Sequence, residues 1–106
     1  MSNSNILNIQ ELRDAVGLTI SDFDAELKQL ESSAIKQLEL CGISPSKIIK
    51  DDNFIVTTII SYVKANFRFT DKDVALRFQD VFEKNKNFMR STAEYTSKGS
   101  EKWWMK

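Results

Sequence analysis

The chain has 106 residues, of which 15 are Lys or Arg and 15 are Asp or Glu, so its formal net charge is zero. It contains no His and a single Cys, which excludes the usual zinc sites, the Ser–His and Cys–His nucleophile pairs and a disulfide framework. The neutral charge balance argues against a general polyanion binder, and 42% apolar residues are enough for one small folded domain.

The balanced charge conceals a difference between the two halves of the chain. Residues 1–45 carry three basic and seven acidic side chains, a net charge of −4, whereas residues 46–106 carry 12 and eight, a net charge of +4. Two halves of opposite net charge allow head-to-tail contacts between identical subunits, although they can also be two independent solvated surfaces.

The first predicted helix is short and well delimited. Asn8 and Glu11 have the spacing of a capping box, Ile9, Leu12 and Val16 recur at helical spacing, and Gly17 stands where a left-handed cap is needed. We therefore expect about two turns of helix over residues 9–16.

A second, longer helix is predicted from Ser21, as its N-cap, to Gly42. Acidic residues follow the cap, as the helix dipole favours. The apolar positions advance by three or four residues and draw one stripe, which consists of Phe23, Leu27, Leu30, Ala34, Leu38 and Cys41. Glu31 and Glu39 lie off this stripe, so we expect both on the solvated side, and we expect Cys41 to be a packed, reduced thiol.

Residues 43–52 read as a connector around Pro45, with Ile48 and Ile49 packed on the core and room for a single helical turn over residues 46–50. The following apolar segment, Phe54–Phe67, is rich in β-branched residues and could form a buried strand. A central helix is favoured because the segment runs for 14 residues without a turn signal and no other segment could pair with a strand. Asp51 or Asp52 is its expected N-cap.

The last helix is predicted to open at residues 70–73. One face carries its apolar side chains, which are Val74, Phe78, Val81 and Phe82 and then Phe88 and Met89. Phe69 is expected to plug the gap between helices, and the helical pattern fades over residues 91–94. The fold prediction is therefore an all-α bundle of about four helices over residues 1–94, with a flexible C-terminal arm over residues 95–106.

No catalytic constellation is evident. The acidic residues gather in the first turns of predicted helices, where the dipole explains them, and the three glycines are isolated rather than part of a phosphate loop. We therefore predict no catalytic residue, no metal site, no cofactor and no enzymatic activity. No segment reaches the roughly 18 apolar residues of a membrane span, and residues 1–5 do not resemble a secretory signal, so we expect an intracellular protein that does not bind membranes.

The C-terminal third combines Lys and Arg with aromatic residues, a mixture used to bind single-stranded nucleic acids. A small nucleic-acid-associated regulatory protein is therefore an alternative function. The last residues include Trp103, Trp104 and Met105 after a polar stretch, and Trp is a frequent anchor at protein interfaces. These side chains could dock on a partner, fold back on their own domain or lie at a membrane surface, and docking on a partner is the favoured prediction.

The order of these segments resembles the small head-tail connector (adaptor) proteins of tailed bacteriophages, in particular those of phages and prophages of Gram-positive bacteria. The resemblance covers residues 8–95. It depends on residues 62–67 (Tyr-Val-Lys-Ala-Asn-Phe) followed by Asp71, then on residues 77–79 (Arg-Phe-Gln), and finally on residues 89–91 (Met-Arg-Ser) with Tyr95.

The resemblance implies a structural protein of the virion head-tail junction, present in the host cytoplasm during assembly. Such proteins form a homo-oligomeric ring beneath the portal protein, twelve-fold in the particle, although an isolated subunit can be a monomer. The ring extends the channel through which DNA passes as cargo, and it offers a docking surface to stopper or tail completion proteins.

In such rings the chain termini reach the portal, so the arm residues Tyr95, Trp103, Trp104 and Met105 are the predicted portal contacts. The arm itself is not part of the pattern that carries the resemblance. The helices over residues 21–41 and 71–90 are expected to supply the lateral subunit contacts, for which the candidate residues are Glu31, Glu39, Arg77, Lys84 and Arg90.

Overall fold

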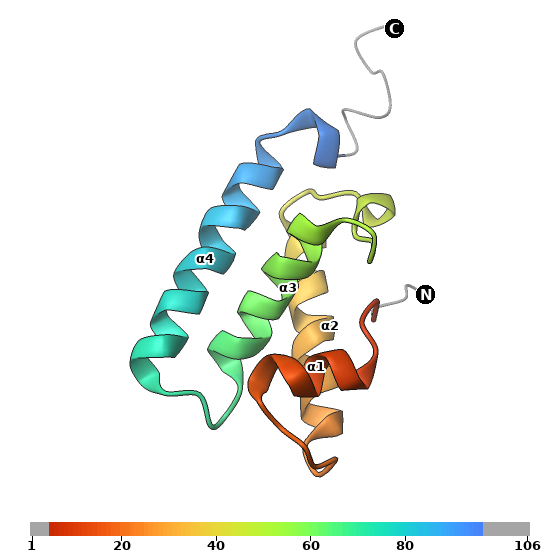
Figure 1. Cartoon of the computed structure of the whole chain (residues 1–106). Coiled ribbons are helices and arrows are strands. Elements are labelled where there is room, and N and C mark those ends of the chain that lie inside the picture. Colours follow the sequence, from red (N-terminus) through yellow and green to blue (C-terminus); the bar gives the residue numbers. More distant parts are fainter. Residues whose placement is uncertain (1–4, 97–106) are drawn as a thin grey trace, which may run out of the picture.

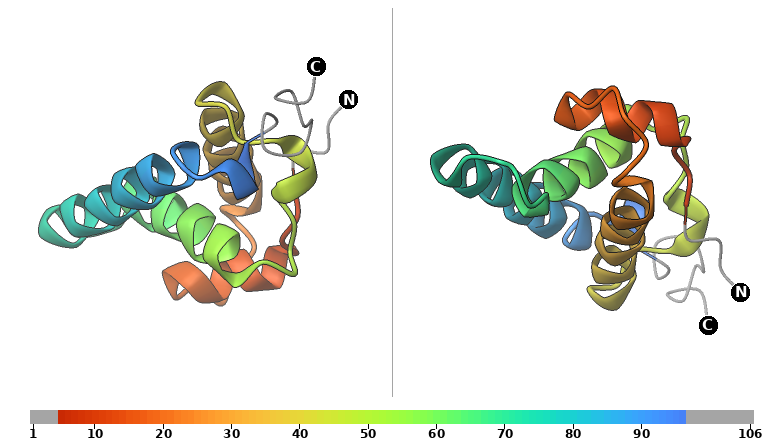
Figure 2. Two further views of the ribbon diagram at one scale, coloured as in Figure 1. Left: turned by 90° about the horizontal axis from the view of Figure 1, so that it is seen from above. Right: turned by 90° about the horizontal axis from the view of Figure 1, so that it is seen from below.

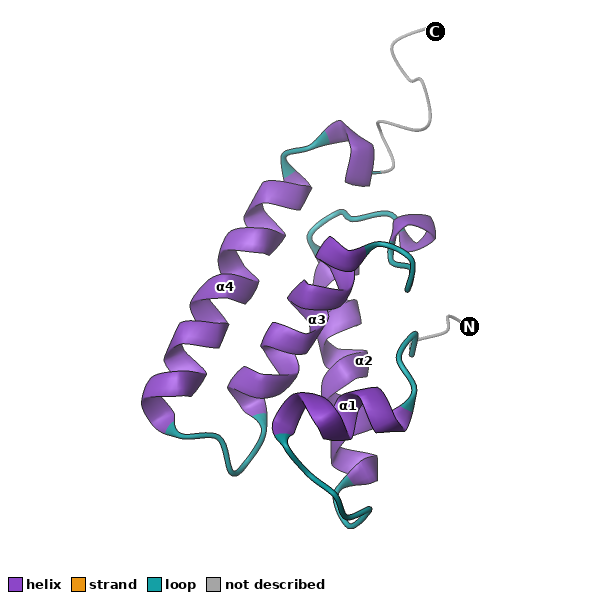
Figure 3. Ribbon diagram, in the orientation of Figure 1, coloured by secondary structure: helices purple, strands orange, loops and turns teal. Residues whose placement is uncertain are grey.

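A computed structural model describes residues 5–96, which fold into four α-helices and two 3₁₀ turns (Figure 3). The elements in chain order are α1 (Ile9–Val16), α2 (Asp24–Leu40), η1 (Pro45–Lys47), α3 (Asn53–Asn66), α4 (Lys72–Arg90) and η2 (Ala93–Tyr95). Residues 5–96 contain no strand, only one antiparallel bridge between Ile43 and Thr96. The predicted all-α bundle of four helices is confirmed.

The helix α3 lies in the middle of the bundle (Figure 1). It packs against α1 and α2 on one flank and against α4 on the other. Views along the bundle show α4 diverging from α1 and α2 toward its N-terminal end (Figure 2). As a result α3 has neighbours along most of its circumference, whereas α4 packs mainly on α3 and on η2.

The short helix α1 has the predicted ends. The Asn8 side chain accepts a hydrogen bond from the Glu11 backbone N–H at 2.9 Å, and the Glu11 carboxylate accepts one from the Asn8 N–H at 2.9 Å. Gly17 closes the helix in the left-handed conformation, with a φ of 77°, which a residue with a side chain rarely adopts.

The start of α2 differs from the prediction. The helix begins at Asp24 rather than at Ser21, and no side chain caps its first backbone N–H groups. The Asp24 carboxylate instead receives the Arg13 guanidinium of α1, with 2.8 Å between Nε and Oδ1. This hydrogen bond to Arg13 lowers the pKa of Asp24, and the ion pair fixes α1 against the start of α2.

The segment after α2 packs on the core through fewer of its side chains than expected. Its helical turn is η1, which includes Pro45, and of the two isoleucines expected on the core only Ile48 is buried, because Ile49 is 45% exposed. Cys41 is half-buried and its thiol donates to the Leu38 carbonyl at 3.3 Å.

The ambiguous apolar segment forms the central helix α3, as predicted. Asp52 caps it, because its carboxylate accepts hydrogen bonds from the Phe54 and Ile55 N–H groups at 2.9 and 3.3 Å. Three residues of α3 are exposed, namely Asn53, Thr57 and Asn66. Its buried hydroxyls bond within the helix, so the apolar surroundings leave no polar atom unpaired there.

The apolar face of α4 is narrower than predicted. Phe82 and Met89 are fully buried, but Val81 is 36% exposed and Phe88 is 57% exposed. The reason is that α4 meets one neighbouring helix over most of its length, and a single contact covers a narrow strip of a helix surface. Phe69 packs edge to face on Phe23 and Phe67 but is 65% exposed, so it covers the end of the bundle rather than plugging it.

Candidate assembly surface

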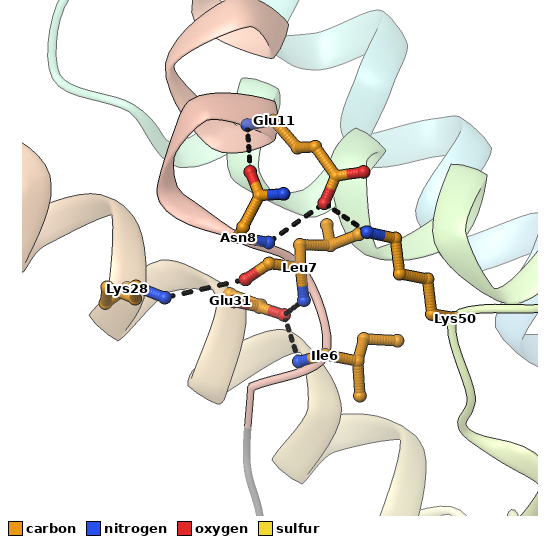
Figure 4. Close-up of polar contacts among 7 residues, drawn as sticks. All are labelled: Ile6, Leu7, Asn8, Glu11, Lys28, Glu31 and Lys50. Atoms are coloured by element: carbon orange, nitrogen blue, oxygen red, sulfur yellow. Dashed lines mark hydrogen bonds and ion pairs between the residues drawn. The ribbon is translucent and has the colours of Figure 1, made fainter.

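Among residues 5–96 the most deeply buried charged side chain is Glu31, so its predicted position on the solvated side of the helix is wrong. Its carboxylate accepts hydrogen bonds from the backbone N–H groups of Ile6 and Leu7 at 2.7 and 2.8 Å (Figure 4). The Asn5 side chain donates to the other carboxylate oxygen at 2.6 Å. Glu31 therefore binds the segment ahead of α1 and is not exposed to a second subunit.

Neighbouring contacts hold the same segment, residues 5–8, against the bundle. Lys28 donates to the Leu7 carbonyl at 3.5 Å, and Lys50 forms an ion pair with Glu11 at 2.9 Å (Figure 4). The Leu7 side chain is buried in the core. A signal for the position of Glu31 exists in the sequence, since it falls between Leu27 and Ala34 at the spacing of four and three residues that marks one helix face.

Tyr95, predicted as the first residue of the arm, is part of the folded domain. It is buried beside Phe54, and its hydroxyl donates to the Asp52 carboxylate at 2.9 Å. Burial and this carboxylate raise the pKa of Tyr95 to about 12. The Tyr95 carbonyl also accepts the Ser44 N–H at 2.8 Å, so the folded part extends to Thr96, two residues past the predicted boundary. Trp103, Trp104 and Met105 lie outside the described residues.

Two of the predicted interface residues share one exposed stripe of α4. Arg77 and Lys84 alternate with Val81 and Phe88 at steps of four, three and four residues, so the four residues lie along one side of the helix. We call these residues the α4 stripe. The Phe88 ring, at the end of this row, also meets the Phe54 ring of α3 edge to face. Sequence reasoning missed its apolar members because it placed them on the buried face.

The remaining interface candidates lie elsewhere. Glu39 is half-buried on α2, next to a groove of about 510 Å³ that also contacts Tyr62. Arg90 is exposed in the last turn of α4, on a different side from the α4 stripe. The structure therefore brings Arg77 and Lys84 together and leaves Glu39 and Arg90 apart from them.

A second hollow surface lies between α1 and α4. One hollow of about 380 Å³ is lined by Leu7, Glu11, Asp14, Ala15, Val56, Ile60 and Lys64. A smaller hollow of about 230 Å³ shares Ala15 and Lys64 with it and continues past Val16, Thr70, Val74 and Phe78. We call the two together the α1–α4 groove. Its lining combines apolar side chains with a few charged ones, a composition suited to binding a protein segment.

The described residues gather no three His, Cys, Asp or Glu side chains in a group that could hold a metal ion. Within residues 5–96, no helix is both long and apolar enough to cross a bilayer. The described surface offers an exposed stripe and two grooves as candidate binding surfaces.

Comparison with known proteins gives one family. A family model described as phage connector protein matches residues 8–96. No curated protein and no solved structure matches the chain significantly. The matched range begins at the N-cap of α1 and ends at Thr96, where the described structure ends, so it covers nearly the whole folded domain.

Proposed function

Because the chain belongs to the phage connector protein family, we propose that it is the head-tail adaptor that assembles as a ring beneath the portal protein. Membership of this family supports a structural role at the virion head-tail junction. In the proposed ring, twelve copies extend the channel through which DNA passes and provide the surface for stopper or tail completion proteins. The observation that carries the proposal is the family match across nearly the whole folded domain.

The surface of the subunit supports ring formation. A ring needs two different surfaces on each subunit, because each copy contacts the next head to tail. The α4 stripe is exposed, basic and partly apolar, whereas the first half of the chain has an acidic excess. We propose that Arg77 and Lys84 belong to one of these surfaces and Glu39 to the other. Glu31 is no longer proposed as a subunit-interface residue, because its carboxylate binds the N-terminal segment.

The C-terminal residues are the proposed contact with the portal. Tyr95 is bonded to the cap of α3, so it fixes the point from which the chain continues toward Trp103, Trp104 and Met105. Two adjacent indole rings provide a large apolar area of the kind that dominates binding energy at interfaces. Tyr95 thus fixes the start of the arm to the folded domain, and the later residues are the proposed portal contact.

Binding to the cognate portal tests the proposal. We expect the full chain to be captured by immobilised portal, and a chain ending at Thr96 to be captured much more weakly. The matched control is the full chain with Trp103→Ala and Trp104→Ala, which should behave like the shortened chain. Equal capture of all three would contradict the role of the arm, and no capture of any would contradict the adaptor function.

The alternative, a regulatory protein that binds nucleic acids, is supported by the exposed basic residues of α4. Two of its lysines are partly neutralised by neighbours, because Lys84 pairs with Asp80 and Lys86 with Glu83, each at 3.0 Å. Affinity for DNA or RNA that falls steeply with salt would favour this alternative. The absence of binding at low salt would exclude it.

A further inference from the structure

The α1–α4 groove is open to solvent and mainly apolar, and no element among residues 5–96 covers it. Its floor contains Val56 and Ile60 of α3, and its walls contain Ala15 of α1 and Phe78 of α4. At about 380 Å³ the larger hollow falls within the range of about 300–1,000 Å³ typical of ligand pockets. The groove therefore has room for a bulky side chain.

The polar groups of the groove are few and defined. Lys50 neutralises Glu11, whereas Asp14 accepts a hydrogen bond from the uncharged Gln10 side chain at 2.8 Å, so Asp14 gives the wall on the α1 side its negative charge. Lys64 lies over the Phe78 ring, with 4.7 Å between Nζ and the ring centroid. A segment that combined aromatic rings with lysines would find apolar contact on the floor and the Asp14 carboxylate on one wall.

The sequence contains one segment of this kind outside the described residues. Residues 97–106 carry three lysines against one glutamate, together with Trp103, Trp104 and Met105. The described part of the chain ends at Thr96, beside the cap of α3, through the Tyr95–Asp52 hydrogen bond. Val56, the first groove residue of α3, is one turn beyond that cap, and its N–H bonds to the Asp52 carbonyl.

The length of the segment is sufficient. Seven residues separate Thr96 from Trp103, and they span at most about 23–25 Å when extended. Tyr95 packs on Phe54, about half a turn around α3 from Val56, and a path around half of a helix of about 10–12 Å diameter is about 16–19 Å long. The segment is therefore long enough to pass around the start of α3 and to reach the part of the groove over Val56.

From these observations we infer that the α1–α4 groove binds the C-terminal residues 97–106 of the same chain in the free protein, with Trp103 or Trp104 seated over Val56 and Ile60. The groove thus keeps the apolar side chains of this segment from solvent until the segment binds a partner such as the portal. The inference concerns the free protein and goes beyond the proposed adaptor function, in which the same residues contact the portal.

Intrinsic fluorescence tests the inference directly, because Trp103 and Trp104 are the only tryptophans. We expect the full-length protein to show blue-shifted emission and weak quenching by acrylamide. Ala15→Arg places a long side chain in the middle of the groove and should shift the emission to the red and raise quenching several-fold. Ala25→Arg, on the exposed side of α2, is the matched control and should change neither. Arg and Ala both favour helices, so both variants keep the helix propensity.

Asp14→Lys, at the exposed rim, is a second variant for the case in which Ala15→Arg does not fold, and it should also increase quenching. Solvent-exposed indoles in the wild type, or equal quenching in the groove variants and the control, would overturn the inference. Blue-shifted emission that appears only at high protein concentration would overturn it as well, since the segment would then bind a second copy. Portal capture is measured separately: Ala15→Arg should be captured at least as well as the wild type, whereas failure of the adaptor function would abolish capture of both.

Discussion

The helices α3 and α4 lie side by side, yet they differ in how much of their surface is buried. Of the 14 residues of α3, all but three are at least partly covered, and they contact three other helices. Of the 19 residues of α4, two are fully buried, and the helix packs mainly on α3. The helix α3 therefore contributes mainly to the stability of the fold, whereas α4 leaves much of its surface exposed.

The two helices are joined by a side-chain hydrogen bond as well as by apolar packing. Asn85 of α4 donates to the Thr58 hydroxyl of α3 at 3.1 Å, and that hydroxyl donates to the Phe54 carbonyl at 2.7 Å. The Tyr62 and Phe82 rings meet edge to face with centroids 5.0 Å apart. Substitutions on the inner side of α4 should therefore affect folding, and those on its outer side should affect assembly.

The largest effect is expected at the centre of α3. Ile59→Ala removes a fully buried side chain and should lower the free energy of unfolding by about 2–5 kcal/mol, because it leaves a cavity in the core. Leu76→Ala on the outer side of α4, which is 62% exposed, should change it by less than about 0.5 kcal/mol. Urea unfolding followed by far-ultraviolet circular dichroism measures both, and similar values would contradict the contrast between the helices.

The next effect concerns the buried carboxylate of α2. Glu31→Met removes the oxygen that accepts both the Ile6 and the Leu7 backbone N–H groups, and it should cost about 1–3 kcal/mol. Glu39→Met, on the same helix but without these partners, is the control and should cost little. Hydrogen exchange at Ile6 and Leu7 should accelerate in the first variant alone. Unchanged exchange there would show that Glu31 does not hold the segment.

A smaller effect is expected at Tyr95. Tyr95→Phe should cost about 1 kcal/mol at neutral pH, through the lost hydrogen bond to Asp52. The pKa of Tyr95 is raised from 10 to about 12 in the folded protein, so its contribution is fully present below pH 10 and is lost as the pH rises through 12. The stability of the wild type should therefore fall more steeply than that of the variant between pH 10 and 12. Parallel curves would contradict the buried hydrogen bond.

The smallest effect on folding is expected on the α4 stripe. Arg77→Ala combined with Lys84→Ala should change the free energy of unfolding by no more than about 0.5 kcal/mol, because both side chains are exposed, Ala favours helices and the Lys84–Asp80 pair is a surface pair. The same variant should bind a single portal site but fail to complete a ring, as measured by the mass of the portal complex. A complete ring from a well-folded variant would show that the stripe is not a subunit contact.

The helices were predictable where local signals decide. The capping box at Asn8 and Glu11, the glycine at position 17 and the cap at Asp52 act within a few residues, so the ends of α1 and the start of α3 follow from sequence. The start of α2 was not predictable, since Asp24 is held by Arg13, 11 residues away. Likewise the exposure of Phe88 depends on how many helices surround α4, and periodicity alone does not report that number.

The sequence by itself determined an all-α domain and, through the order of its segments, the connector family. Helix periodicity and caps are local properties, so one chain is enough to establish them. Tertiary structure alone decided that Glu31 binds the backbone of Ile6 and Leu7, that Tyr95 closes the domain on Asp52, and that a groove lies open between α1 and α4. These features arise between segments 20 or more residues apart, where the physical cause is packing in space rather than spacing along the chain.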